Sequence, residues 1–255
     1  MFNILRASFY KLFRDKTFIV TTFIGLFLSI FIPLLFNLIG MCTAGALLIN
    51  SCSPSNSFGI TVPINLAVFT INEFSNGTIR NKIIAGHSKA KIYLSLFITG
   101  LMFTFVLMVP FVGLSCLFGF LFNGEGITSG ISFDFIWKFI VMAILSYIFI
   151  TSFSILIATS IRGIGGTIPV LVISMVFLAL MPLFAQGSDD TTRTIMSFIN
   201  PVYYLGLYSN ILSSIFSSLI TIDIVEVIAT AVSTLTLTAV CLIVGILEFN
   251  KRDVK

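Results

Sequence analysis

The stretch Ile92–Phe122, IYLSLFITGLMFTFVLMVPFVGLSCLFGFLF, decides the fold of this chain. It runs for 31 residues, from position 92 to position 122, without a charged side chain. About 20 apolar residues are enough for a helix to cross the hydrocarbon core of a bilayer. We therefore expect a membrane-spanning helix here that tilts, bends at Pro110 or extends past the bilayer.

Further apolar runs on both sides of this stretch are long enough to be spans. The whole chain is 57% hydrophobic and 9% charged, whereas soluble domains carry roughly 25% charged residues. This composition excludes a soluble fold and predicts a single membrane domain over residues 1–255. The other expected spans are Thr17–Ile39, Phe135–Thr159, Ile164–Ala185, Val227–Leu247 and a marginal run at about Ser55–Asn72, which includes Pro63.

The placement of the basic residues decides whether the marginal run also spans. Cytoplasmic loops of membrane proteins collect Lys and Arg. With six spans, 12 of the 14 basic residues fall on the side of the two termini, and only Lys138 and Arg193 do not. With five spans, the 80–91 cluster and the basic C-terminus would lie outside. We therefore predict an all-α, six-span protein of a bacterial plasma membrane, with both termini in the cytoplasm.

Two segments outside the spans are apolar enough to touch the membrane. Residues 2–14 predict an amphipathic helix on the inner leaflet, with Lys11 and Arg14 largely opposite its apolar face; a disordered basic stub is the alternative. Residues 186–221 predict short helices that re-enter the outer leaflet or pack against the spans. The alternative there is interfacial anchoring by tyrosines, which are Tyr203, Tyr204 and Tyr208.

Several chemistries have no matching residues in the sequence. No Gly-x-x-x-x-Gly-Lys-Ser/Thr loop occurs, so we do not expect this chain to hydrolyse ATP alone. The single histidine, His87, excludes two-histidine zinc motifs. The expected spans carry no ionisable residue at their middle, which argues against a proton-coupled transporter and a charge-lined cation channel. They also hold no constellation of His, Asp or Glu of the kind that a membrane-embedded enzyme needs. We expect no catalytic residue, cofactor, metal or nucleic-acid partner.

The loop between the second and third expected spans has a pattern of its own. Gly77 permits a sharp turn, Thr78 is a candidate helix cap, and Gly86 is placed to stop the short helix. Ile79, Ile83 and Ile84 are expected on one face, as an apolar knob on the cytoplasmic side. An interfacial turn whose isoleucines dip into lipid is the alternative.

The same loop resembles the corresponding segment of ABC-2 type permeases, the membrane subunits of many ATP-binding-cassette exporters. The basic tail at 249–253 and the Asn-Pro-Val-Tyr-Tyr stretch at 200–204 resemble that family more weakly. The resemblance covers the whole chain by length and expected span count, and it implies the type V exporter-like permease fold. The matching loop residues are Glu73, Gly77, Thr78, Arg80, Gly86, Lys89 and Tyr93.

The resemblance implies a function and its partners. Two copies, identical or closely related, would pair above two separate ATPase subunits and export an amphipathic or hydrophobic substrate, with a peptide toxin or antimicrobial favoured. Residues 74–90 would form the contact with the ATPase, Ile83 and Ile84 filling a groove while Arg80 pairs with a partner carboxylate or with Glu73. A secondary transporter or channel without an ATPase is the alternative, and membrane lipids are expected partners in either case.

Two cysteines fall in the first expected outer loop. Cys42 and Cys52 are close in sequence and would lie on the oxidising side of the membrane. A disulfide bridge between them is one prediction, and two free thiols are the other, since the family resemblance does not require a bridge.

Overall fold

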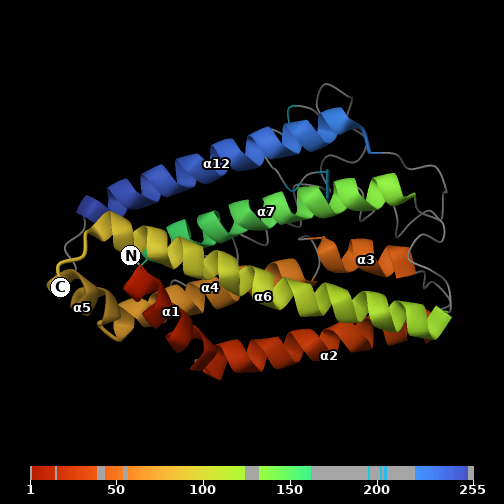
Figure 1. The fold of residues 1–255 in the computed structure, drawn as a ribbon, viewed down its shortest axis with the longest axis horizontal. Helices are drawn as coiled ribbons and strands as arrows, with labels where there is room; N and C mark the ends of the chain where they lie inside the picture. The colour runs from red at the N-terminus through yellow and green to blue at the C-terminus, as the bar shows by residue number, and fades with distance from the viewer. Residues whose placement is uncertain are drawn as a thin grey trace.

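The computed structural model describes most of the chain, namely residues 2–14, 16–38, 44–53, 57–123, 132–161, 195, 202, 204, 205 and 222–251. Throughout this part every regular element is an α-helix (Figure 1). The helices are α1 (Phe2–Arg14), α2 (Lys16–Leu38), α3 (Ala44–Cys52), α4 (Ser57–Ser75), α5 (Thr78–Ile84), α6 (Lys89–Asn123), α7 (Phe133–Ser160) and α12 (Ile224–Lys251).

Three of these helices are long and apolar enough to cross a membrane, judged by length and composition. They are α6, α7 and α12, with mean hydropathies of 2.3, 2.4 and 2.3. Helix α6 has 35 residues, which corresponds to about 52 Å and exceeds the roughly 30 Å hydrocarbon core, as expected. Helices α2 and α4 overlap two further expected spans; α2 packs mainly against α6, and α4 mainly against α7. The expected span Ile164–Ala185 lies outside the described residues.

Helix α3 lies in the segment that was expected to be the first outer loop, between the first two expected spans. It packs against α6 and α7, and its Leu47, Leu48 and Ile49 are buried. In Figure 1, α3 occupies the half of the bundle far from the termini, while α4 occupies the half near them. The segment AGALLINSC has no charge, so it can be buried, but its nine residues are too few to be recognised as a span.

Cys52 lies at the end of α3 as a free cysteine that is 1% exposed. Its burial follows from the packing of α3 against α6 and α7. The predicted partner, Cys42, lies outside the described residues, so the bridge between the two cysteines stays a prediction.

Small and hydroxyl-bearing residues bring the long helices together. A Cβ atom added at Gly100 of α6 would lie 2.9 Å from Ile155 and 3.1 Å from Thr151, so the glycine allows α6 and α7 to pack closely. The hydroxyls of Thr104 and Thr151 lie 3.1 Å apart across the same interface. Helix α12 packs mainly against α7 and also against α6.

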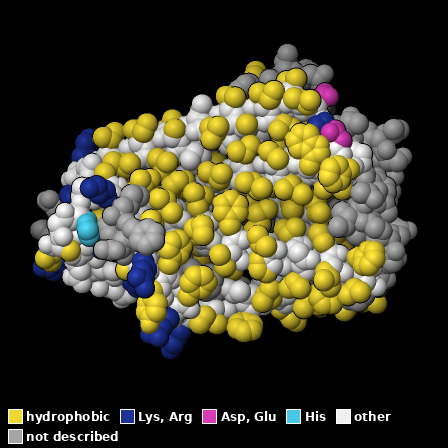
Figure 2. Space-filling view, viewed as in Figure 1, with side chains coloured by type: hydrophobic (Ala, Val, Ile, Leu, Met, Phe, Trp, Pro, Cys, Tyr) yellow, Lys and Arg dark blue, Asp and Glu magenta, His cyan; other side chains and the backbone are white. Residues whose placement is uncertain are grey.

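The two ends of the bundle carry opposite charge. Helix α1, helix α5, the start of α6 and the end of α12 lie at one end, where Figure 2 shows the Lys and Arg side chains gathered. The starts of α7 and α12 lie at the other end, where Figure 2 shows Asp and Glu side chains. Asp134 and Lys138 belong to the start of α7, Glu226 to the start of α12, and Asp223 directly precedes α12. Among the described residues, the charge asymmetry predicted from the sequence is therefore present in the folded protein.

Four residues of the 186–221 segment are described. Val202, Tyr204 and Leu205 are buried in the core shared with the long helices, whereas Ile195 is exposed. At these three buried positions the segment packs against the helices, which is one of the two arrangements that the sequence left open.

Candidate functional site: the Glu73 cluster and helix α5

The chain leaves α4 at Ser75, turns, forms α5 and turns again into α6. Both turns need glycine, because Gly77 has a φ of +65° and Gly86 a φ of +83°, values that other residues adopt at a cost. Gly86 N–H donates to Ile83 O at 2.9 Å and His87 N–H to Lys82 O at 3.2 Å. This pair of bonds is the Schellman motif that ends helices. The predicted roles of Gly77 and Gly86 are confirmed.

Thr78 does not cap α5, which corrects the sequence prediction. The N-cap residue of α5 is Gly77, and no side chain forms a capping hydrogen bond at this end of the helix. The Thr78 hydroxyl instead accepts a hydrogen bond of 2.9 Å from the Lys11 ammonium of α1. It therefore connects α5 to the N-terminal helix.

The Glu73 carboxylate is the centre of the site. Glu73 lies in the last turn of α4 and its side chain is 0% exposed. One carboxylate oxygen lies 2.7 Å from Lys11 Nζ and the other 2.8 Å from Lys82 Nζ. Two charge-assisted hydrogen bonds of this length compensate the loss of hydration of a buried carboxylate.

The two lysines extend the cluster over three helices. Lys82 of α5 also donates to the Ser8 hydroxyl of α1 at 3.1 Å, and Lys11 bonds both Glu73 and Thr78. We call these five residues, Ser8, Lys11, Glu73, Thr78 and Lys82, the Glu73 cluster. It attaches α1 to the turn between α4 and α5. Lys11 therefore faces the protein, which corrects its expected place on the outer polar face of α1.

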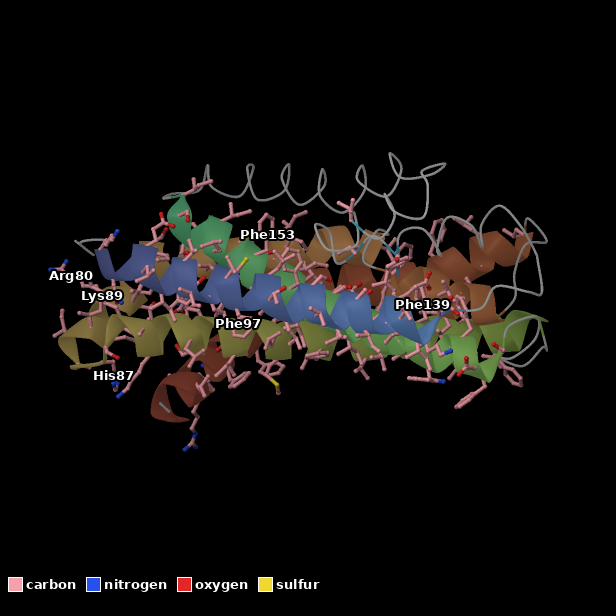
Figure 3. All side chains as sticks on the ribbon, turned by 90° about the horizontal axis from the view of Figure 1, so that it is seen from above. Arg80, His87, Lys89, Phe97, Phe139 and Phe153 are labelled. Atoms are coloured by element: carbon pink, nitrogen blue, oxygen red, sulfur yellow. The ribbon has the colours of Figure 1, made fainter. Side chains whose placement is uncertain are left out.

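Arg80 does not take the place beside Glu73 that the sequence analysis considered. It is exposed at the end of the bundle, where Figure 3 also shows His87 and Lys89. The reason is the helical period, since Lys82 lies four residues after Thr78 and shares its face, whereas Arg80 lies two residues after it and points elsewhere. Lys82 therefore reaches the carboxylate and Arg80 is directed outward.

The three isoleucines of α5 do not share one exposed face. Ile79 is fully buried and Ile83 packs partly buried against the same core, while Ile84 is 73% exposed. Positions 79 and 83 are four residues apart and face the bundle together, but position 84 is turned by about 100° from position 83. The exposed apolar knob expected from the sequence is therefore Ile84 alone.

The start of α6 is connected to the end of α12. Lys89 Nζ donates to the Asn250 carbonyl oxygen at 3.0 Å, near the C-terminal end of α12. The fully buried Tyr93 ring lies 6.1 Å from the Phe249 ring, which in turn lies 5.9 Å from Phe74 at the end of α4. These aromatic contacts join α4, α6 and α12.

Gly245 and Phe249 are site residues that sequence reasoning missed. A Cβ atom at Gly245 would lie 2.0 Å from Tyr93 Oη, so only glycine leaves room for the tyrosine ring. A glycine inside an apolar helical run is a signal of close packing. That signal was present in the sequence at Gly245, but the partner could not be named.

The charged groups of the Glu73 cluster are engaged with one another, and other side chains of α5 point outward. Among the described residues, no group of three or more His, Cys, Asp or Glu side chains could hold a metal ion. The ionisable groups at the centre are ion-paired with one another. What α5 presents outward is Arg80, Asn81 and Ile84, while Ile79 and Ile83 pack against the core.

Comparison with known proteins identifies a family but no activity. No curated protein matches the chain. Residues 57–255 match the family described as protein of unknown function (DUF2705), a range that includes Glu73, α5 and every described residue after them. Because that match covers most of the chain, this protein belongs to the DUF2705 family.

Proposed function

We propose that this chain is the membrane-spanning subunit of an ATP-driven exporter powered by a separate ATPase subunit. In this proposal it has six spans and an ABC-2 type permease fold in a bacterial plasma membrane. Two copies, identical or closely related, pair above two ATPase subunits. The substrate is an amphipathic or hydrophobic molecule, and a peptide toxin or antimicrobial is favoured.

The observation that carries the proposal is the rigid mounting of α5. Its buried face is fixed by Ile79 in the core, and its Lys82 is bound to the buried carboxylate of Glu73. Its ends are defined by the two positive-φ glycines. A partner that pushes on Ile84 would therefore move α4, α1 and the start of α6 together. An ATPase needs such a contact to drive membrane helices.

The charge distribution supports the proposed orientation. The end that carries α1, α5 and the end of α12 is basic, and the opposite end carries Asp134, Asp223 and Glu226. Because basic residues collect on the cytoplasmic side, α5 would face the cytoplasm. That is the compartment in which ATP is available.

The uncharged middle parts of the long helices support a hydrophobic or amphipathic substrate. Within the described parts of α6, α7 and α12, the Lys, Asp and Glu side chains lie near helix ends, with Lys138 in the second turn of α7 and Glu248 near the end of α12. A coupling-ion site normally needs charged or polar ligands near the bilayer midplane. The energy source is therefore better sought outside the membrane domain.

One observation favours the second candidate, a secondary transporter or channel without an ATPase. Helices α3 and α4 occupy the two halves of the bundle in place of one continuous span (Figure 1). Interrupted helices of this kind form ion and substrate sites in many secondary transporters. Whether an ATPase co-purifies with the protein would decide between the two candidates.

The test places a charge on the exposed knob of α5. Ile84→Asp should reduce co-purification with the ATPase by at least about tenfold, because a carboxylate in a water-excluding contact costs several kcal/mol. Val225→Asp is the matched control, since Val225 is 75% exposed on α12 at the opposite end. The wild-type protein is isolated from native membranes through an affinity tag, and bound proteins with a phosphate-binding loop are identified by mass spectrometry.

Three results are informative. Loss of the ATPase with Ile84→Asp and retention with Val225→Asp supports the proposal. Equal retention with both variants shows that α5 is not the contact. A wild-type protein that carries no ATPase rejects the exporter proposal and leaves the secondary transporter.

A further inference from the structure

Helix α1 has two faces with different partners. Its Ser8 and Lys11 side chains belong to the Glu73 cluster and point into the protein. Tyr10 and Phe13 are exposed on the other side, together with Arg6 and Arg14. Ser8 and Lys11 are engaged with the Glu73 cluster. The outward face of α1 therefore consists mainly of aromatic rings and arginines.

The position of α1 places this outward face at the edge of the membrane. Helix α2 follows after one residue, begins at Lys16 and runs for 23 residues, or about 35 Å, close to the thickness of the hydrocarbon core. After Lys16, the exposed residues that are described on α2 are apolar, beginning with Ile19, Val20 and Phe23. The junction of α1 and α2 therefore coincides with the boundary where apolar surface begins.

The side chains at this boundary have the chemistry of a headgroup site. The Arg14 guanidinium lies 4.6 Å from the centre of the Tyr10 ring, and Arg6 and Lys16 are exposed on α1 and at the start of α2. Guanidinium groups bind phosphate through several hydrogen bonds, and aromatic residues favour the interface between headgroups and acyl chains. We propose that Arg6, Tyr10, Phe13, Arg14 and Lys16 form a binding surface for an anionic phospholipid.

The neighbouring surfaces favour a lipid over another anionic partner. Exposed aromatic residues lie between the basic ones of α1, and the exposed apolar residues of α2 begin at Ile19, so the partner that fits best carries a negative charge and an apolar part in the same molecule. The acidic opposite end of the bundle would repel the same lipid, so binding is confined to one leaflet. This surface does not depend on an ATPase partner.

The experiment measures lipid binding to the purified full-length protein. Phosphatidylglycerol is titrated into the detergent-solubilised protein, and bound lipid is counted by native mass spectrometry, with phosphatidylcholine as the neutral comparison. The triple variant Arg6→Gln, Arg14→Gln, Lys16→Gln should bind phosphatidylglycerol roughly 100-fold more weakly, at about fivefold for each basic residue. Phosphatidylcholine binding should not change.

A matched variant separates a local site from general attraction. Arg80→Gln, Lys91→Gln, Lys251→Gln removes the same charge from exposed residues at the same end, and it should weaken binding by less than about threefold. Equal losses in both triple variants would mean diffuse electrostatics, and no loss in the first would mean no lipid surface on α1; either result overturns the proposal. If the first triple variant does not fold, Arg14→Gln alone should show a fivefold loss, and an unchanged affinity rejects the site.

Discussion

Glu73→Gln removes the negative charge that holds two lysines at the junction of α1, α4 and α5. The carboxylate is 0% exposed, and its two oxygens contact Lys11 and Lys82 at 2.7 and 2.8 Å. Removing one partner of a buried ion pair costs about 3–5 kcal/mol, because the remaining charge stays poorly hydrated. Lys82 is 11% exposed and would carry this cost, whereas Lys11 is 34% exposed and can turn towards water.

We therefore expect a loss at the lower end of that range, about 3 kcal/mol. For a chain of this size, each kcal/mol shifts the melting temperature by roughly 2–4 °C, so Tm should fall by about 6–12 °C. The assay is size-exclusion chromatography of the fluorescently tagged protein in detergent after heating. Asp223→Asn makes the same chemical change at an exposed site, and it should lie within about 0.5 kcal/mol of wild type.

A double-mutant cycle tests the reason for the loss. Lys82→Met in the Glu73→Gln background removes the uncompensated ammonium, so the double variant should be more stable than Glu73→Gln alone. A Tm shift below about 2 °C for Glu73→Gln would refute the reasoning, because it would mean that the buried carboxylate contributes no net stability. A double variant less stable than both single variants would show that the cost does not come from Lys82.

Two further predictions concern packing and orientation. Gly245→Ala should destabilise the protein by about 1–3 kcal/mol, because the new Cβ would lie 2.0 Å from Tyr93 Oη; Gly113→Ala, with no atom within 4 Å of its Cβ, should be neutral in the same thermal assay. In a cysteine-free background, an impermeant thiol reagent on intact cells should label Asp223→Cys and leave Ser75→Cys unlabelled, since both positions are exposed but lie at opposite ends; labelling of Ser75→Cys would reverse the proposed orientation.

The sequence predicted the long helices well because length and apolar composition are local properties. The apolar run Ile92–Phe122 lies within α6, and Phe135–Thr159 lies within α7. Helix α3 was missed for the converse reason. Nine uncharged residues satisfy no span criterion, and they are buried only because α6 and α7 surround them.

The candidate site was predicted in part. The two glycine turns follow from residue type alone, and both are present at Gly77 and Gly86. The partners of Glu73 depend on tertiary structure, because Lys11 lies 62 positions away and reaches the carboxylate only once α1 has docked. From the sequence, Lys82 and Arg80 are equally good candidates to pair with Glu73. The start of α5 after Gly77 fixes which of them faces the carboxylate, and it is Lys82.

The inward polar face of α1 changes how the N-terminal helix should be understood. A helix that only lies on the membrane surface would keep its lysine in water. Lys11 instead donates a hydrogen bond to the buried carboxylate of Glu73, close to α5. The outward arginines and aromatic residues are then available for the bilayer. Helix α1 thus connects the lipid boundary to the turn that we propose as the ATPase contact. If lipid binding fails its test while Ile84→Asp still releases the ATPase, α1 serves only to brace α5; if the reverse holds, α1 is a membrane anchor and the site at α5 must contact something else.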